Sequence, residues 1–305
     1  MENIITVSNL QKSFKNNQVL KGVDFTIRRG SIFALLGSNG AGKTTCVKIL
    51  STLTKADGGS ATICGYDVFK QPDNVRGEIS LTGQYAAVDE VLTGRENLRL
   101  IGSLKRIKNA NQQADQFLAA VNLEDAADKP ASTYSGGMRR RLDIAMSLMG
   151  APQIIFLDEP TTGLDPQNRI ALWDMIARLA ENGTTILLTT QYLEEAEYLA
   201  DHIAILHEGK ITAEGSPEEL KKMLPIGEIS LEFATPEIMK KAAQLLKGYN
   251  VKTGRKTIEV STDGSTQQLA DVLNTINTSG IQVARFTQNQ PSLEDAFLTL
   301  IGEKN

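Results

Sequence analysis

A glycine-rich loop between an apolar run and a helical pattern constrains this chain more than any other feature. Residues 31–36 form an unbroken, mostly apolar run, which is typical of a strand buried on both faces. After the loop, Val47, Leu50 and Leu53 recur at helical spacing and predict a helix. The loop therefore turns a buried strand into a helix, which is the context that a phosphate-binding loop requires.

The loop itself has the spacing G-x-x-x-x-G-K-[ST]. Glycines let successive backbone N–H groups curl around an anion, and the start of a helix adds a partial positive charge. In such a loop the lysine reaches the β- and γ-phosphates, and the following hydroxyl ligates Mg²⁺. We therefore predict that a phosphate-bearing ligand binds here, with Thr44 also on the metal; the binding residues are Gly37, Ser38, Asn39, Gly40, Ala41, Gly42, Lys43, Thr44 and Thr45.

A pair of carboxylates follows a second buried strand, residues 154–157. A carboxylate at the C-terminal end of such a strand faces the crevice in which α/β proteins bind ligands. We expect Asp158 to hold Mg²⁺ or its water, and Glu159 to polarise the attacking water. The alternative is two ordinary solvated acids, but Pro160 directly after them favours fixed positions.

The rest of the first 220 residues predicts an α/β fold with a parallel sheet. Residues 184–190 form another apolar strand, and a helix around Leu172, Ile176 and Leu179 separates it from the strand at 154–157. This alternation indicates parallel strands joined by right-handed crossovers. Residues from about 85 to 150 are mostly helical in pattern, and earlier strands are expected at 4–7 and 23–27.

A smaller second domain is expected over residues 221–305. A strand at 229–233 is followed by a helix that Thr235 caps, and then by a strand–strand–helix–strand order. The last of these strands is expected around Ile281 and Val283, with Arg285 as a further candidate. This β-α-β-β-α-β order predicts a ferredoxin-like α+β domain. Ser292 and Asp295 form a capping box for a final helix.

Composition narrows the possible functions. The 305 residues carry 32 Lys+Arg and 36 Asp+Glu, for a net charge of −4, which argues against broad nucleic-acid binding. No run reaches the length of about 18 apolar residues that a membrane-spanning helix needs. The start of the chain lacks the pattern of a signal peptide. We therefore expect a chain that does not cross a membrane by itself.

Several motifs together resemble those of ATP-binding cassette (ABC) ATPases. They cover about the first 220 residues, and their order is highly specific to that family. Tyr134 to Met138 resembles the signature motif, Gln84 the Q-loop and Phe14 the adenine-stacking aromatic. Residues 161–166 resemble the D-loop, with its Asp165.

Three further segments resemble the daunorubicin-resistance type of drug-export ATPase, which carries a small C-terminal domain. These segments are residues 82–90, residues 189–196 and residues 291–298. The resemblance implies an RecA-like parallel core, an antiparallel β subdomain and a helical subdomain at about 85–150, followed by the α+β domain.

The resemblance also implies partners. In this family two copies form a head-to-tail dimer, and ATP held by Lys43 of one copy is closed over by the signature motif of the other. In this chain that motif is Ser135, Gly136, Gly137 and Met138. Gln84 would link Mg²⁺ and the attacking water to the region from Tyr85 to about Ile107, which touches a separate membrane permease. The chain would then lie at the cytoplasmic face of the membrane and bind no nucleic acid.

Two positions depart from the common pattern of the family. Gln191 stands where most relatives have His, so it can hydrogen-bond a γ-phosphate but cannot carry a proton. We expect that contact to survive and catalysis to rest on Glu159, the alternative being an inactive site. Phe14 replaces the commoner Tyr and keeps the aromatic face for adenine. It could instead be a plain core residue.

Other residues have simpler interpretations. The run Arg139 to Arg141 is expected to be a solvated or dimer-facing stretch, and Glu194 and Glu195 a solvated helix face. Two rival functions remain open from the sequence. One is a non-transport ABC ATPase, such as a translation or DNA-repair factor, and the other is a regulatory ATP-dependent binding protein.

Overall fold

The structure is a computed structural model that describes residues 2–84, 86–223, 228–262, 265–289 and 292–302. The chain divides into two compact units, Met1–Pro217 and Glu218–Asn305. The dividing point lies three residues before the boundary expected from the sequence.

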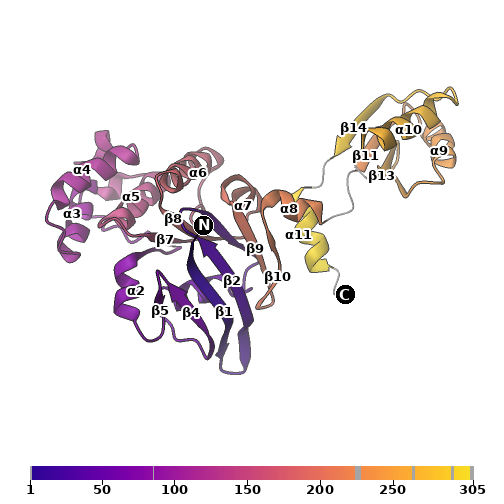
Figure 1. Ribbon diagram of the computed structural model, residues 1–305. Coiled ribbons are helices and arrows are strands. Elements are labelled where there is room, and N and C mark those ends of the chain that lie inside the picture. The colour runs from indigo at the N-terminus through magenta and orange to yellow at the C-terminus, as the bar shows by residue number, and fades with distance from the viewer. Residues whose placement is uncertain (1, 85, 224–227, 263–264, 290–291, 303–305) are drawn as a thin grey trace. The chain divides into compact units, whose positions relative to one another are not determined.

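A six-stranded sheet forms the centre of the first unit (Figure 1). Neighbouring strands are parallel except at one edge of the sheet, where residues 202–207 and 210–215 form an antiparallel hairpin. Every residue of the three central strands is buried, as their apolar runs predict. The order across the sheet is β10 (Lys210–Gly215), β9 (His202–His207), β3 (Ile32–Leu36), β8 (Thr185–Thr190), β7 (Ile154–Asp158) and β6 (Ile79–Thr82).

Helices connect these parallel strands. The connection after β3 begins with the glycine-rich loop, and Leu50 is the last residue of the helix that follows it. Leu53, expected on that helix, lies beyond its end and is 65% exposed. The connecting helices are α1 (Lys43–Leu50), α2 (Pro72–Glu78), α6 (Pro166–Glu181) and α7 (Leu193–Leu199).

A four-stranded antiparallel sheet packs against the same core. Its first two strands are longer than their apolar stretches predicted, because the polar residues near their hairpin turn continue the backbone pairing to Phe14 and Asn17. One hydrophobic cluster contains residues of both sheets, including Ile5, Phe25 and Phe33. The order is β2 (Asn17–Arg28), β1 (Asn3–Phe14), β4 (Gly58–Ile63) and β5 (Tyr66–Asp67).

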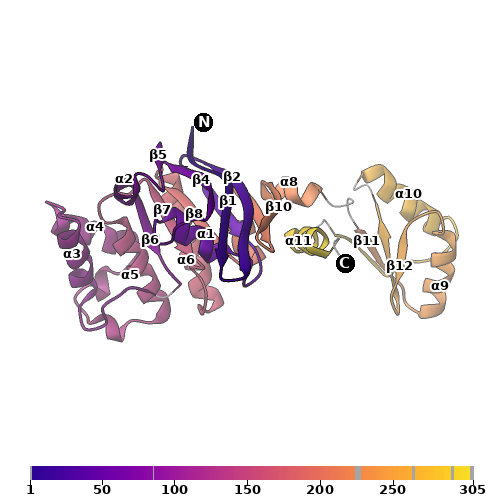
Figure 2. The ribbon, with the colours of Figure 1, turned by 90° about the horizontal axis from the view of Figure 1, so that it is seen from below.

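The region predicted to be helical contains three α-helices, α3 (Gly94–Leu104), α4 (Ala110–Ala120) and α5 (Gly136–Leu148). They lie together to one side of the strands (Figure 2). Two short 3₁₀ helices, Glu124–Ala126 and Ala131–Thr133, lie between α4 and α5. Tyr85, the expected start of this region, falls outside the described residues.

The second unit has the predicted ferredoxin-like order. Its sheet is antiparallel, in the order β12 (Val251–Thr253), β13 (Thr257–Ser261), β11 (Glu228–Glu232) and β14 (Arg285–Asn289). α9 (Pro236–Leu245) and α10 (Thr266–Asn277) share a buried cluster with it. The last strand begins at Arg285, the further candidate, so only the placement of Ile281 and Val283 in it is wrong. Both residues instead pack as partly buried side chains against the cluster.

Two further helices belong mostly to this unit, α8 (Pro217–Lys222) and α11 (Leu293–Gly302). The predicted capping box of α11 is present, because Ser292 N donates to Asp295 Oδ2 at 2.9 Å and Asp295 N donates to Ser292 Oγ at 3.1 Å. Pro291, in the motif before it, lies outside the described residues.

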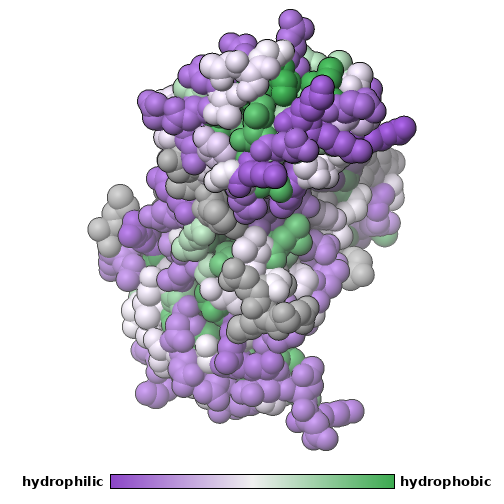
Figure 3. Space-filling view, turned by 90° about the vertical axis from the view of Figure 1, so that its right-hand side faces the viewer, coloured by the Kyte–Doolittle hydropathy of each residue, from purple (hydrophilic) through white to green (hydrophobic). Residues whose placement is uncertain are grey.

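One face of the molecule is largely polar. In Figure 3, hydrophilic residues cover most of the face in view, and hydrophobic ones form small separate areas. Among the helices of the described ranges, none is both long and apolar enough to cross a membrane.

Candidate functional site

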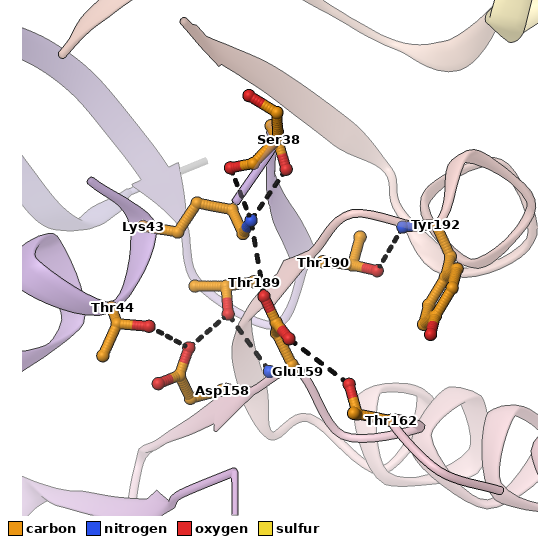
Figure 4. Close-up of polar contacts among 10 residues, drawn as sticks. Ser38, Lys43, Thr44, Asp158, Glu159, Thr162, Thr189, Thr190 and Tyr192 are labelled. Carbon is orange, nitrogen blue, oxygen red and sulfur yellow. Dashed lines mark hydrogen bonds and ion pairs between the residues drawn. The ribbon is translucent and has the colours of Figure 1, made fainter. Parts of the chain in front are cut away.

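The glycine-rich loop leaves β3 and wraps around the side chain of Lys43. Lys43 Nζ donates hydrogen bonds to the carbonyl oxygens of Gly37 at 2.7 Å and Ser38 at 3.1 Å (Figure 4). Gly42 precedes α1 with a φ of 112°, which a side chain would disfavour. At Gly37 a Cβ atom would lie 2.3 Å from the carbonyl oxygen of Leu206, so the close approach of the two backbones requires glycine.

The ammonium group of Lys43 is also paired with a carboxylate. Its Nζ lies 3.4 Å from Glu159 Oε1, and both side chains are largely buried, at 4% and 12% exposed. Burial lowers the pKa of Lys43, while the nearby charges of Glu159 and Asp158 act in the opposite direction. The loop therefore presents a desolvated positive group beside two carboxylates.

Asp158 ends β7 and faces the first turn of α1. Its Oδ1 accepts hydrogen bonds from Thr44 Oγ1 at 3.2 Å and from Thr189 Oγ1 at 2.5 Å. A hydroxyl and a carboxylate are hard oxygen donors, which fits a Mg²⁺ site of the kind that uses one or two carboxylates plus substrate phosphates. No cluster of three or more His, Cys, Asp or Glu side chains suited to a metal occurs among the described residues.

Glu159 has a left-handed backbone, with a φ of 48°. Such a conformation is unfavourable for a residue with a side chain, and strained residues of this kind cluster at active sites. Two groups of Thr189, the carbonyl oxygen and Oγ1, accept hydrogen bonds from Glu159 N, each at 3.1 Å. Thr162 Oγ1 donates to Glu159 Oε2 at 3.3 Å. The carboxylate is thus held in place rather than freely solvated.

These groups open into one pocket of about 660 Å³. Asp158 lies behind it, and Gly37, Ser38 and Ala41 belong to the loop without lining it. The lining brings together residues that the sequence separates widely: Phe14, Asn17, Val19, Asn39, Gly40, Gly42, Lys43, Thr44, Thr45, Gln84, Glu159, Thr162 and Gln191.

Phe14 and Gln191 both face this pocket. Phe14 ends β1 and is 49% exposed, so it is not a core residue. Lys12 Nζ lies 5.3 Å from the centroid of its ring. Gln191 directly follows β8, at the C-terminal edge of the sheet, where ligands of parallel sheets bind.

The signature residues do not line this pocket. Ser135 is the N-cap of α5, and its Oγ accepts a hydrogen bond from Met138 N at 3.3 Å. Ser135 and Gly136 are exposed, whereas Gly137 is buried against Asn168, whose Oδ1 would lie 2.3 Å from an added Cβ. Asp165 is the N-cap of α6 and accepts from Asn168 N at 3.0 Å, which lowers the pKa of Asp165. The starts of α5 and α6 therefore meet at Gly137.

The sequence reasoning missed four residues of the site, namely Asn17, Val19, Thr162 and Thr189. Thr189 binds both Asp158 and Glu159, and its place at the end of a buried parallel strand was an available signal. Asn17 and Val19 enter the pocket only because β1 and β2 pair as a hairpin.

Two charged residues expected at the surface are buried. Glu195 on α7 is 0% exposed, and its Oε1 accepts from Thr161 Oγ1 at 2.8 Å and from Trp173 Nε1 at 3.0 Å. Arg140 on α5 is 5% exposed. Both expectations failed because helical periodicity alone did not reveal which face packs against the neighbouring loops.

Two family models match the chain. The model described as ABC transporter matches residues 20–162, and the model described as the C-terminal domain of DrrA1-3-like ATP-binding proteins matches residues 215–301. The first match contains the glycine-rich loop, the signature motif and both carboxylates.

Curated relatives match nearly the whole chain. The daunorubicin resistance ATP-binding protein DrrA2 of Streptomyces coeruleorubidus is 42% identical over 97% of this chain and 94% of its own length. The daunorubicin/doxorubicin resistance protein DrrA of Streptomyces peucetius is 41% identical over 98% of this chain and 92% of its own length. The Nod factor export ATP-binding protein I of Ralstonia nicotianae is 39% identical over 71% and 68%.

Solved structures match the first unit. An ATP-binding cassette of an ABC transporter in its ADP conformation superposes with a TM-score of 0.65 at 26% identity, over 72% of this chain and 93% of that one. A dimeric cassette in a post-hydrolysis state, bound to ADP and Pi, superposes with a TM-score of 0.63 at 25% identity, over 70% and 98%. The predicted fold class is confirmed. This chain belongs to the family of ABC transporter ATP-binding proteins, and within it to the daunorubicin-resistance type.

Proposed function

We propose that this chain is the ATP-hydrolysing subunit of an exporter for a drug or antibiotic-like compound, and that Glu159 is its catalytic base. Membership of the family makes it an ATPase coupled to transport. The observation that carries the assignment of Glu159 is its carboxylate, fixed in the pocket 3.4 Å from Lys43 Nζ by a strained backbone.

The remaining pocket residues divide the work of holding ATP. Phe14 stacks on the adenine, and the backbone N–H groups from Asn39 to Thr45 with Lys43 bind the phosphates. Thr44 and Asp158, with Gln84 nearby, would hold Mg²⁺, which would neutralise phosphate charge. Glu159 accepts a proton from the attacking water, and the amide of Gln191 donates a hydrogen bond to the γ-phosphate.

A second copy of the chain completes the site. The exposed first turn of α5, with Ser135 and Gly136, does not line the pocket of its own chain, and a helix start of this kind attracts phosphate. In a head-to-tail dimer this turn meets the γ-phosphate held by Lys43 of the partner. Asp165 then lies in the loop that borders both sites.

Closure of this dimer acts on a separate membrane permease. Val91, Leu100 and Leu104, all in or next to α3, are exposed apolar side chains that suit a protein partner. The permease places this subunit at the cytoplasmic face of the membrane. Residues 1–220 form the motor and residues 221–305 an accessory domain. No observation favours either rival function, so neither a translation or DNA-repair role nor a purely regulatory role is proposed.

Transport in inverted membrane vesicles tests this function. Vesicles that contain this chain and its permease are supplied with ATP and a fluorescent anthracycline. We expect ATP-dependent uptake, which is lost in the Glu159→Gln variant. The control is Gln112→Ala, which should retain uptake because Gln112 is an exposed residue of α4 with no proposed role in the site. ATP hydrolysis without uptake of any tested drug-like compound contradicts the proposed substrate class.

A further inference from the structure

An ion pair is buried within α5, one turn beyond the signature motif. Arg140 Nη1 lies 3.2 Å from Asp143 Oδ2, and each side chain is 6% exposed. Burial lowers the pKa of Arg140, against the opposing charges of Asp143, Glu195 and Asp158, and burial raises the pKa of Asp143. Burying two charges is costly, so a pair of this kind is a weak source of stability and invites another explanation.

The guanidinium of Arg140 binds the backbone on both sides of Glu159. Its Nε donates to the carbonyl oxygen of Pro160 at 2.7 Å, and its Nη2 donates to that of Asp158 at 3.4 Å. Peptide groups that flank a residue determine where its Cα lies. The side chain of Arg140 therefore holds the strained turn at Glu159.

The same pair binds the backbone on both sides of Gln84. Arg140 Nη1 donates to the carbonyl oxygen of Gly83 at 2.6 Å. Asp143 Oδ1 accepts from Ala87 N at 3.1 Å. Arg140 therefore binds the backbone before Gln84, and Asp143 binds the backbone after it.

We propose that Arg140, with Asp143, is a positioning residue that sets Gln84 and Glu159 relative to the helix that carries Ser135. This inference rests on the proposed roles of those three residues. A shift of α5 is passed through the rigid fork of Arg140 to the turn at Glu159 and to the segment of Gln84 at once. The pair connects the surface that meets the second copy with the groups that act on water.

Arginine suits this task better than lysine. Its five N–H donors lie in one plane, so that a single side chain reaches three carbonyl groups and a carboxylate. The neighbouring arginines bind elsewhere: Arg139 Nη1 donates to Glu90 Oε1 at 2.7 Å, and Arg141 Nη1 donates to the carbonyl oxygen of Val121 at 2.8 Å. Arg141 is therefore a matched control on the same helix.

Steady-state ATPase kinetics and equilibrium binding of a fluorescent ATP analogue test the proposal in the full chain. We expect Arg140→Met to lower kcat by about tenfold or more while the ATP Kd changes by less than about threefold, since positioning acts on the transition state. Arg140→Lys restores part of the loss, and Arg141→Met stays within about twofold of the wild type in kcat. Thermal unfolding reports whether each variant folds.

A double variant separates positioning from a general structural role. If Arg140 acts through Gln84, the losses of Arg140→Met and Gln84→Ala do not multiply, and the double variant is little slower than the slower single one. Wild-type kcat in a folded Arg140→Met, or fully multiplying losses, overturns the proposal. Should Arg140→Met fail to fold, Arg140→Lys decides: the proposal predicts a lowered kcat at unchanged Kd, and wild-type kcat overturns it. Failure of the proposed function shows separately, as wild-type turnover in Glu159→Gln.

Discussion

The ammonium group of Lys43 supplies a positive charge to the proposed phosphate site and is largely buried from water. Its Nζ has two carbonyl partners and the carboxylate of Glu159 within 3.4 Å. Because water is largely excluded there, attraction between the ammonium and a phosphate is stronger than at the surface. The carboxylate of Glu159, 3.4 Å from this ammonium group, is the group proposed to act on an attacking water.

A substitution at Gln191 tests the proposed hydrogen bond from its amide to the γ-phosphate. We expect Gln191→Ala to lower kcat by about tenfold and to change ATP affinity by less than about threefold, because its hydrogen bond strengthens as charge develops on the γ-phosphate. Steady-state ATPase assays and equilibrium ATP binding measure the two quantities. Gln112→Ala on α4 is the matched control. Equal turnover in Gln191→Ala and the wild type would remove Gln191 from the mechanism.

Gly37 tests whether the close approach of two backbones shapes the loop. In Gly37→Ala the new Cβ would lie 2.3 Å from the Leu206 carbonyl oxygen, so the backbone at one of the two positions must shift. We expect a loss of about 1–3 kcal/mol in unfolding free energy and much weaker ATP binding. Gly77→Ala on α2, which meets no atom within 4 Å, should be neutral or stabilising by up to about 1 kcal/mol. Urea unfolding and ATP titration check both, and unchanged ATP binding in Gly37→Ala contradicts the account.

At the residue scale, the site residues that belong to a short sequence motif could be predicted. The burial of residues outside such motifs could not. Lys43, Thr44 and Glu159 stand in short patterns whose chemistry requires their residue types, so the sequence located them. Arg140 and Glu195 stand on helices whose polar residues look solvated. Their burial depends on which loops pack over them, and that information is spread over segments far away in the chain.

Among the elements, α5 begins at a residue with two roles, Ser135, one structural and one proposed for function. Ser135 caps the helix through Oγ, and it is proposed to meet a partner's phosphate. Ser265 caps α10 in the same way, accepting from Gln268 N at 3.1 Å, and lies in the second unit. The two serines therefore form a matched pair with the same local role.

Replacing each serine separates capping from function. We expect Ser135→Ala and Ser265→Ala each to lower the unfolding free energy by about 1 kcal/mol, since both lose a cap. Only Ser135→Ala should also lower ATPase turnover. Chemical denaturation and ATPase assays measure both effects. Equal turnover in the two variants would leave Ser135 with a structural role alone.

Element type was easier to predict than element boundaries. Buried strands such as β3 and β7 are continuous apolar runs, and few other structures accept them. β14 begins after Ile281 and Val283 because packing against the cluster of the second unit, rather than strand pairing, buries these two residues. The hairpin of β1 and β2 extends through polar residues, which hydrophobic periodicity does not register.

At the scale of the whole molecule, the proposed dimer divides each ATP site between two copies of the chain. The pocket with Lys43 and Glu159 lacks the signature residues of its own chain among its lining. A solved relative in a post-hydrolysis state with ADP and Pi is dimeric. The proposed mechanism therefore requires that ATP, held on one copy, binds the second copy.

The oligomeric state of the Glu159→Gln variant tests this requirement most directly. The substitution keeps the shape of the side chain and removes the proposed base, so bound ATP persists. We predict that sedimentation velocity with Mg-ATP shows a dimer of the 33.2 kDa chain, which returns to monomer when ATP is removed. Lys43→Ala added to this variant should prevent the dimer. A Glu159→Gln protein that stays monomeric at saturating ATP, or that hydrolyses ATP at the wild-type rate, would contradict the central claim.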